Sequence, residues 1–369
     1  ALRWFADFHI DALRLDAVHA LRDDSPQHIL AQLSDEVAAL SARLGRPLAL
    51  IAESDLNDAS MVAPTAAGGR GMDAQWDDDV HHALHVTLTG ETQGYYADFV
   101  GHCRAMPDGG PLAVLAKTLT RAFLHDGTWS SFRGTDWGAP VERRGTNGHR
   151  FLAYLQTHDQ VGNRATGERI GALVDTGLQA AGAALYLTSA YTPMVFMGEE
   201  WGAGTPFQFF TDFDDPGLAA AVTRGRRAEF ALHGWASQDV PDPQDEATYR
   251  RSQLDWAEPH EGEHARLLQW YRDLVALRRH EPSLGDGRLD LVGVDFDEDA
   301  RWLVMRRGPV RTVVNLSSSR WSVPLDTEPV EVLLAWEPAQ TKTQPRGIHL
   351  PPGTAAVVRV ATTPPLSLT

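Results

Sequence analysis

The amino-acid sequence predicts an α/β fold, with the C-terminal part of a (β/α)8 TIM barrel followed by a small all-β domain. Over residues 1–282, short apolar runs alternate with helical patterns, which is typical of parallel strands joined by helices. Over residues 283–369, short alternating segments are divided by Gly, Pro and Ser, which is typical of an antiparallel β-sandwich. Strands in this second region are expected at 301–306, 311–316, 321–325, 330–336 and 354–360.

The first predicted unit is a strand, a helix and a second strand. Residues 12–16 alternate apolar and charged side chains, as a strand with one buried face does. A helical pattern covers residues 26–44, with Ser25 as its expected N-cap and Gly45 at its end. The apolar run at 48–53 then predicts a strand parallel to the first.

The remaining elements of the first region are fewer than a closed barrel needs. Further strands are expected near residue 75, at 151–156 and at 194–197, and further helices at 111–125, 175–190 and 264–280. Residues 54–110 are expected to form a long insert that carries binding loops. Because a closed barrel has eight strands, we expect this chain to hold about strands 4 to 8. The missing N-terminal barrel half would come from the same gene product or from a separate chain.

Composition argues against several classes of function. The 369 residues carry a formal net charge of −16, which disfavours nucleic acid and anionic membranes as partners. No run of about 18 apolar residues occurs in the sequence, so no membrane span is expected. Cys103 is the only cysteine, so an intrachain disulfide is impossible and a reducing, cytoplasmic location is expected.

Three predicted strand ends carry a carboxylate, namely Asp16, Glu53 and Asp159. The carboxyl ends of barrel strands form one rim, so these side chains are expected to lie together. Several carboxylates without a metal suit glycoside hydrolysis, and no metal or other cofactor is expected. Arg14 shares a strand face with Asp16 and should keep it ionised as a nucleophile. Glu53 is the expected general acid, and Asp159 is expected to orient sugar hydroxyls or stabilise the transition state.

Other polar and aromatic residues near the strand ends are candidate substrate contacts. The expected contacts are Arg14, His19, Asp55, Trp76, His158, Gln160, Glu199 and Trp201. His81, His82 and His85 have the spacing of a helical histidine pair, but a glycan contact or a plain loop is preferred to a metal site. Each candidate has a structural alternative, because strand-end acids also form ion pairs and cap loops, and some aromatic residues must pack in the core.

At these positions the chain resembles the α-amylase family of retaining α-glucoside enzymes. The segment LRLD that ends at Asp16 is similar to the family's nucleophile strand. The pair AE that ends at Glu53 is similar to the acid/base strand, and the pair HD that ends at Asp159 to the stabiliser motif. The family's first motif, an Asp followed by Asn-His, is absent, which implies that the first three strands belong to another segment.

Longer stretches are similar to the members of this family that act on maltooligosyltrehalose. These stretches are LRLDAVHAL, AQWDDDVHHALHVTLTGETQGYYADF, THDQVGNRA, MGEEWGAGTPFQFFTDF and PDPQDEATYRRSQLDW. The resemblance implies hydrolysis of the α-1,4-glucosidic bond next to the terminal trehalose, with release of trehalose. It makes Asp16 the nucleophile, Glu53 the acid/base and Asp159 the stabiliser. His19, where many relatives have Lys, agrees with this group.

Two other functions remain open at this point. An α-1,4-glucan branching enzyme has the same three carboxylates but transfers the glucan to a hydroxyl group instead of water. A non-catalytic α-glucan-binding protein on a degenerate barrel would not need all three carboxylates. A barrel lyase or metal-dependent isomerase is disfavoured, because the sequence offers no credible cluster of metal ligands.

Overall fold

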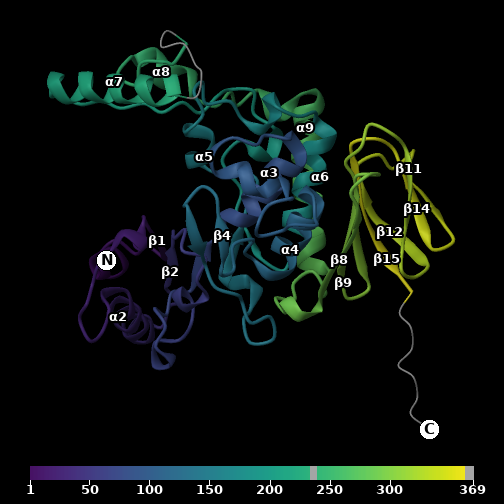
Figure 1. The fold of residues 1–369 in the computed structure, drawn as a ribbon, viewed down its shortest axis with the longest axis horizontal. Helices are drawn as coiled ribbons and strands as arrows, with labels where there is room; N and C mark the ends of the chain where they lie inside the picture. Colours follow the sequence, from purple (N-terminus) through teal and green to yellow (C-terminus); the bar gives the residue numbers. More distant parts are fainter. Residues whose placement is uncertain (233–238, 362–369) are drawn as a thin grey trace.

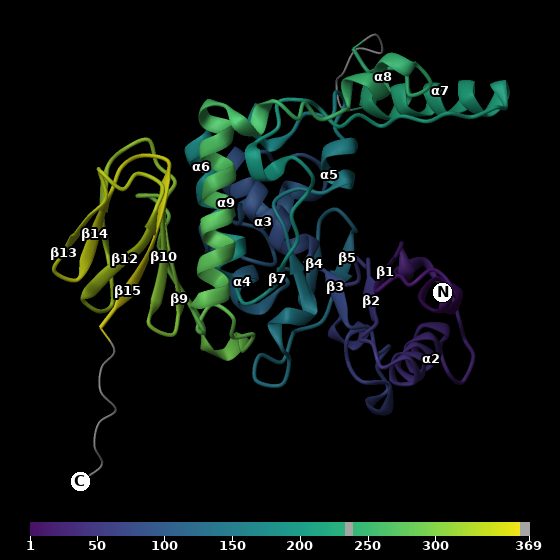
Figure 2. The same ribbon diagram turned by 180° about the vertical axis from the view of Figure 1, so that it is seen from behind.

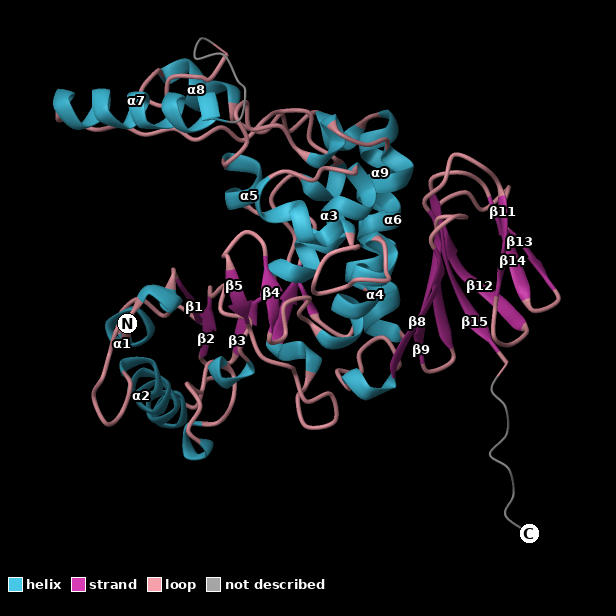
Figure 3. Ribbon diagram, viewed as in Figure 1, coloured by secondary structure: helices cyan, strands magenta, loops and turns pink. Residues whose placement is uncertain are grey.

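The computed structural model describes residues 1–232 and 239–361. A parallel sheet with surrounding helices forms one part of the molecule, and antiparallel sheets form another (Figure 1). Figure 2 shows from behind that α9 (Gly262–His280) stands between the two parts. The predicted α/β class with an all-β C-terminal region is therefore confirmed, as the separation of strands in Figure 3 also shows.

The parallel sheet has five strands in the order β1-β2-β3-β6-β7 among the described residues. They are β1 (Ala12–Leu15), β2 (Ala49–Ala52), β3 (Ala74–Trp76), β6 (Phe151–Ala153) and β7 (Thr192–Pro193). Each neighbouring pair runs parallel. The prediction of a strand at 194–197 is wrong. The N–H of Met194 donates to the carbonyl of Ala153 at 2.9 Å, and β6 ends there, so the following residues have no strand to pair with.

Helix α2 (Ile29–Leu44) begins later than the predicted residue 26. The side chain of His28 is the N-cap, and its Nδ1 accepts from the N–H of Leu30 at 3.2 Å. The carboxylate of Asp23 accepts from the N–H of Ile29, so two of the first free N–H groups are satisfied there. The predicted end is confirmed, because Gly45 stops the helix with a φ of 62°.

The other helices include five that the sequence did not predict as elements. They are α1 (Leu2–Ala6), α3 (Asp78–Thr89), α4 (Pro111–Arg121), α5 (His158–Gly162), α6 (Thr176–Leu187), α7 (Pro216–Leu232) and α8 (Glu246–Arg251). The unpredicted ones are α1, α3, α5, α7 and α8. Helix α3 lies inside the expected insert at 54–110 and is capped by Asp77, whose carboxylate accepts from the N–H of Val80 at 3.3 Å. Helices α7 and α8 extend away from the rest of the chain (Figures 1 and 2).

The C-terminal region contains two antiparallel sheets, with strand orders β12-β15-β10-β9-β8 and β11-β14-β13. The strands are β8 (Val292–Asp297), β9 (Trp302–Arg307), β10 (Val310–Asn315), β11 (Trp321–Pro324), β12 (Pro329–Ala335), β13 (Lys342–Gln344), β14 (Gly347–Leu350) and β15 (Thr354–Val360). Strands β8, β13 and β14 were missed. A short antiparallel pair, β4 (Thr128–Ser130) and β5 (Thr135–Trp137), lies in the first region. The domain boundary near residue 283 stays a prediction.

The larger antiparallel sheet packs on the helices of the first region through a shared apolar core. The hydroxyl groups of Thr188 and Thr312 lie 2.7 Å apart, and Arg307 donates to the carbonyl of Thr188 at 3.0 Å. The carboxylate of Glu298 accepts from two N–H groups at the start of α4. Polar and apolar contacts therefore both join this sheet to the helical layer behind the parallel strands. No helix in the described ranges is long and apolar enough to cross a membrane.

Candidate active site

One guanidinium brings together the three carboxylates that the sequence singled out. Arg14 on β1 places Nη1 2.5 Å from Oδ1 of Asp16. Its Nη2 lies 3.8 Å from Oε2 of Glu53 and 3.8 Å from Oδ2 of Asp159. Asp16 and Glu53 each follow the last residue of a strand, and Asp159 is the second residue of α5. The carboxyl ends of the parallel strands thus form the rim that the sequence predicted.

Backbone contacts between β1 and β2 hold Glu53 in place. The N–H of Glu53 donates to the carbonyl of Leu15 at 2.9 Å, and the carbonyl of Glu53 accepts from the N–H of Val18 at 3.1 Å. The N–H of Ala17 donates to the carboxylate of Glu53. Ala17 has a φ of 44°, which is uncommon for a residue with a side chain and turns its N–H toward Glu53. This backbone turn after β1 therefore orients a carboxylate on β2.

The three carboxylates differ in how much solvent they meet. The side chain of Asp16 is 76% exposed, that of Asp159 43% and that of Glu53 20%. Asp16 is the most open to an incoming ligand, whereas Glu53 is mostly covered. Such different surroundings are what two carboxylates need to take different roles in one reaction.

The indole ring of Trp76 lies against the guanidinium of Arg14. The guanidinium carbon of Arg14 lies 4.5 Å from the centre of the Trp76 ring, a cation–π geometry that limits where the charge can move. Trp76 also meets the rings of Tyr154 at 5.6 Å and His158 at 5.9 Å, edge to face. His158 in turn has Nε2 3.4 Å from Oδ1 of Asp159. Trp76 and His158, both expected substrate contacts, thus belong to the carboxylate group.

Asp78 is a site residue that the sequence analysis did not select. The hydroxyl of Tyr154 donates to Asp78, and Nε2 of Gln160 donates to Asp78 at 3.3 Å. Burial raises the pKa of Asp78 to about 6 against the lowering effect of the Tyr154 bond, and the charges of Glu53 and Asp159 add to the rise. The available signal was the run Asp77–Asp79 directly after β3, a fourth strand end with carboxylates. Gln160, an expected contact, meets this group through Asp78.

Asp55 and His19 form a second group beside the carboxylates. Nδ1 of His19 lies 3.6 Å from Oδ1 of Asp55, and Nη2 of Arg133 lies 2.8 Å from Oδ2 of Asp55. The guanidinium of Arg133 lies 4.2 Å from the ring centre of Trp137. Asp55, Asp78, Arg133 and Trp137 line one pocket, so this group is continuous with the site around Asp78. Trp137 is the last residue of β5 and Arg133 lies in the turn before it, and neither β4 nor β5 was predicted from the sequence.

Glu199 and Trp201 are not brought to the carboxylates. Glu199 is buried and accepts from Gln156 at 3.2 Å, from the hydroxyl of Tyr186 at 2.7 Å and from that of Tyr271 at 2.9 Å. Burial raises the pKa of Glu199 to about 7. These three donors occupy its carboxylate, so the structure places Glu199 in the core between α6 and α9. Trp201 lines a different cavity, described below.

The histidine group lies on helix α3, so its interpretation as a loop is wrong. His81 and His85 are buried, with ring centres 5.7 Å apart, and His85 stacks on Tyr96 at 4.5 Å. Burial lowers the pKa of His82 to about 3, with the charges of His85 and Arg133 contributing. The buried rings of His81 and His85 are core packing, whereas the half-buried His82 lines the pocket that contains Asp55 and Asp78. Within the described residues, no group of three or more His, Cys, Asp or Glu is placed to hold a metal ion.

This geometry supports acid, base and nucleophile chemistry on a neutral ligand. An ionised, accessible carboxylate can attack an electrophilic carbon, and a covered carboxyl group beside it can exchange a proton. A third carboxylate and a histidine can bind hydroxyl groups or a developing positive charge. Two or more carboxylates around one bond are the working parts of glycoside hydrolysis.

Comparisons with known proteins point to the same chemistry. Residues 287–358 match a family model described as "Domain of unknown function (DUF3459)". A malto-oligosyltrehalose trehalohydrolase from Mycobacterium tuberculosis is 51% identical over 337 residues, which cover 91% of this chain and 56% of that protein. The Arthrobacter ramosus protein of the same name is 49% identical over 360 residues, or 98% of this chain and 59% of that protein. The chain thus spans somewhat more than half the length of the curated relatives that it matches.

Comparison of the fold with solved structures agrees with the sequence comparison. A crystal structure titled "Putative alpha Amylase from Salmonella typhimurium" aligns with a TM-score of 0.82 and 33% identity, covering 98% of this chain and 59% of that one. Other matched structures include an Anoxybacillus α-amylase with a TM-score of 0.56 at 17% identity, a likeness in fold alone. Over nearly its whole length, the chain is therefore similar in sequence to the malto-oligosyltrehalose trehalohydrolases and in fold to proteins named as α-amylases.

Proposed function

We propose that this chain carries the catalytic carboxylates of a retaining glycoside hydrolase. The enzyme would cleave the α-1,4-glucosidic bond next to the terminal trehalose of maltooligosyltrehalose and release trehalose. The observation that carries this proposal is the convergence of Asp16, Glu53 and Asp159 on the guanidinium of Arg14. The names of the relatives supply the substrate.

In the first step, the carboxylate of Asp16 attacks the anomeric carbon of the glucose unit next to trehalose. Glu53 donates its proton to the glycosidic oxygen as that bond breaks, and trehalose leaves as a neutral alcohol. Asp16 is then esterified to the maltooligosyl chain. The exposure of Asp16 and the cover over Glu53 support this division of roles.

In the second step, Glu53 removes a proton from water, whose oxygen attacks the same anomeric carbon. The ester bond to Asp16 breaks, which frees the carboxylate and a maltooligosaccharide. Asp159 and His158 are proposed to bind hydroxyl groups of the reacting sugar and to oppose the positive charge of the transition state. Arg14 remains beside all three carboxylates throughout and keeps Asp16 in position.

The substrate-binding residues are proposed in two groups. The first group, Arg14, Trp76 and His158, contacts the reacting sugar. In the second group, Asp55 lines the pocket with Arg133 and Trp137, His19 lies against Asp55, and Gln160 donates to Asp78 of the same pocket. The location of Glu199 in the core speaks against a direct contact with the substrate. A cytoplasmic location is proposed from the use of a single cysteine.

Further strands are proposed to complete the sheet into a barrel. Strands β1 and β7 are its two edges, and neither has a second strand partner among the described residues. The segment that would supply these strands could belong to the same gene product or to a separate chain. If the present chain hydrolyses the substrate as fast as a form with that segment, this proposal is wrong.

Product analysis on maltotriosyltrehalose tests the proposed reaction. The expected products are trehalose and maltotriose, with maltotriose first appearing as the α-anomer by NMR because two displacements retain configuration. The Asp16→Asn variant is expected to lose at least about 10³-fold in kcat and still bind substrate, since only the nucleophile is removed. Asp24→Asn, on an exposed loop, is the matched control and should keep full activity.

Three outcomes would overturn the proposal. A new glucan branch without new reducing ends would indicate a branching enzyme. Binding of the substrate without turnover, even with the completing segment present, would indicate an α-glucan-binding protein. An active Asp16→Asn variant would remove Asp16 from the role of nucleophile.

A further inference from the structure

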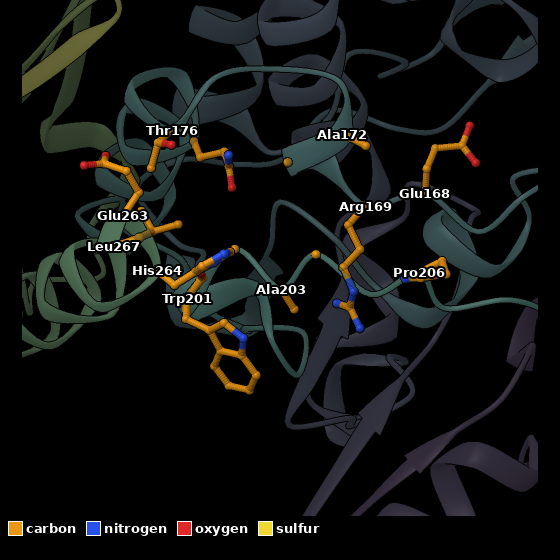
Figure 4. Close-up of a pocket in the computed structure, with 14 residues that line it drawn as sticks. Glu168, Arg169, Ala172, Thr176, Trp201, Ala203, Pro206, Glu263, His264 and Leu267 are labelled. Atoms are coloured by element: carbon orange, nitrogen blue, oxygen red, sulfur yellow. The ribbon is translucent and has the colours of Figure 1, made fainter. Parts of the chain in front are cut away.

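A second cavity lies apart from the carboxylates, beside the first turns of α6 and α9. Its volume is about 370 Å³, within the range of roughly 300–1,000 Å³ that is usual for small-molecule sites. Figure 4 shows Arg169 and Pro206 on one side of it and His264, Leu267 and Thr176 on the other. None of the residues that contact Arg14 lines this cavity. The proposed glycosidase chemistry therefore leaves the cavity without a role.

The cavity wall contains a buried amide oxygen that has no partner. Gln179 on α6 is 6% exposed, and its Nε2 donates to the carbonyl of Val174 at 3.4 Å, which sets the orientation of the amide. Its Oε1 is fully covered and meets no hydrogen-bond donor in the described ranges. Buried acceptors of this kind are rare and require an explanation.

Two glycines lie against this oxygen. A Cβ added to Gly171 would lie 3.3 Å from Oε1 of Gln179, and a Cβ added to Gly202 would lie 3.0 Å from it. Both glycines line the cavity together with Gln179, so a side chain at either position would press on Oε1 in the cavity wall. A hydroxyl group of a ligand in the cavity is the kind of donor that Oε1 of Gln179 lacks.

A buried donor on the same cavity wall is also unpaired. Arg169 is 3% exposed, and its Nε and Nη1 donate to the carbonyls of Thr205 at 2.7 Å and Met197 at 2.8 Å. Its Nη2 is covered and has no acceptor among the described residues. On the other side, Nδ1 of His264 lies 2.8 Å from the carbonyl oxygen of Trp201, which leaves Nε2 of that ring for another contact. The cavity thus offers both donors and acceptors.

The charges around the cavity disfavour an anionic ligand. Glu168 and Glu263 line it, and the charges of Glu199, Glu200 and Glu258 act on the guanidinium of Arg169. These carboxylates would repel an anion. A sugar hydroxyl is neutral and can donate to one group while it accepts from another, which matches the unpaired acceptor of Gln179 and donor of Arg169.

We propose that this cavity is a binding site for a neutral sugar of about one pyranose ring, separate from the carboxylate site. The buried indole of Trp201 supplies apolar surface for the ring, as aromatic side chains do in small-molecule sites. The proposal does not depend on the proposed hydrolase function, because it uses none of the residues of that reaction.

Indole NMR signals can follow the two sites in one titration with D-glucose. Trp201 lines the cavity and its Nε1 donates to Glu258 at 3.1 Å, whereas Trp76 lies under Arg14 at the carboxylates. The variants Trp201→Phe and Trp76→Phe assign the two signals by their loss. We expect glucose to shift the Trp201 signal saturably, with a weaker effect from the anion glucuronate.

Two variants close or alter the cavity without touching the carboxylates. Gly171→Ala places a methyl group against Oε1 of Gln179, and Gln179→Met removes the amide at similar size. Each is expected to weaken the glucose-dependent shift of Trp201 at least about tenfold in apparent affinity and to leave that of Trp76 unchanged. Gln269→Met on the exposed face of α9 is the matched control and should change neither response.

Several results would overturn the proposal. One is a Trp201 signal that does not move with glucose in the folded wild-type protein, whether or not Trp76 responds. Another is an equal Trp201 response in Gly171→Ala and Gln179→Met, which would mean that the shift arises elsewhere. If glucuronate binds more strongly than glucose, the ligand of the cavity is an anion and not a neutral sugar. These measurements can be interpreted even if the protein does not hydrolyse maltotriosyltrehalose, because they follow glucose binding directly.

Discussion

The raised pKa of Asp78 makes a quantitative prediction about stability. Its ordinary value is 3.8, and in the folded protein it is about 6, chiefly because of burial. Between these two values the folded state holds a proton that the unfolded state has lost. The free energy of unfolding therefore falls as the pH rises from about 4 to 6, and this contribution stays absent at higher pH.

The size of the effect follows from the pKa difference. A rise of about two pKa units corresponds to about 3 kcal/mol between the two ends of the range. Asp78 is partly exposed, so solvent screening lowers our expectation to about 1–2 kcal/mol. Asp78→Asn has the same shape without the charge, and its Oδ1 can still accept from the hydroxyl of Tyr154. The variant should therefore escape this loss.

Urea unfolding of the wild type and Asp78→Asn at pH 4 and pH 7 measures the difference. Relative to the wild type, the variant is expected to gain about 1–2 kcal/mol in stability between the two pH values. Asp24→Asn on an exposed loop is the control, since it removes one carboxylate without a buried environment. The reasoning is refuted if Asp78→Asn and the wild type lose the same stability with pH.

Three further predictions use the same structure. Arg14→Met is expected to lower kcat/KM on maltotriosyltrehalose at least about 10²-fold, because three carboxylates lose their shared cation. Steady-state kinetics measure this change, and an unchanged kcat/KM would contradict the prediction. Glu199→Leu is expected to cost about 3 kcal/mol or more in urea unfolding, because three buried donors lose their acceptor, and a loss below about 1 kcal/mol would contradict it. Gly45→Ala, with a φ of 62° and open space, should cost about 1 kcal/mol. Gly101→Ala should cost clearly more, because its Cβ would overlap the carbonyl of Gly109; equal melting temperatures for these two variants would contradict the comparison.

Much of the carboxylate rim could be predicted because its signal is local. Alternation over residues 12–16 puts Arg14 and Asp16 on one face, and the structure joins them at 2.5 Å. The end of an apolar run likewise marks Glu53. Parallel pairing of β1 with β2 then brings these two strand ends together without any further information.

The start of α2 shows where local signals compete. Ser25 and Pro26 match the usual first residues of a helix, so the sequence favours a start at 26. In the structure, His28 and the more distant Asp23 satisfy the first N–H groups instead. Several residue types can cap the same helix, and the choice among them depends on the path of the preceding loop, which no periodic pattern records.

The support around the carboxylates depends on contacts between elements that are far apart in the chain. Asp78 begins α3, and the residue that binds it, Tyr154, follows β6 more than seventy positions later. The run Asp77–Asp79 marks the first position, but no local pattern marks Tyr154 as its partner, and their contact exists only because β3 and β6 are neighbours in the sheet. The same neighbours place Trp76 against Tyr154. The residues that follow β1 and β2 can therefore be selected from sequence alone, whereas the residues that hold them become visible only when the order of the strands is known.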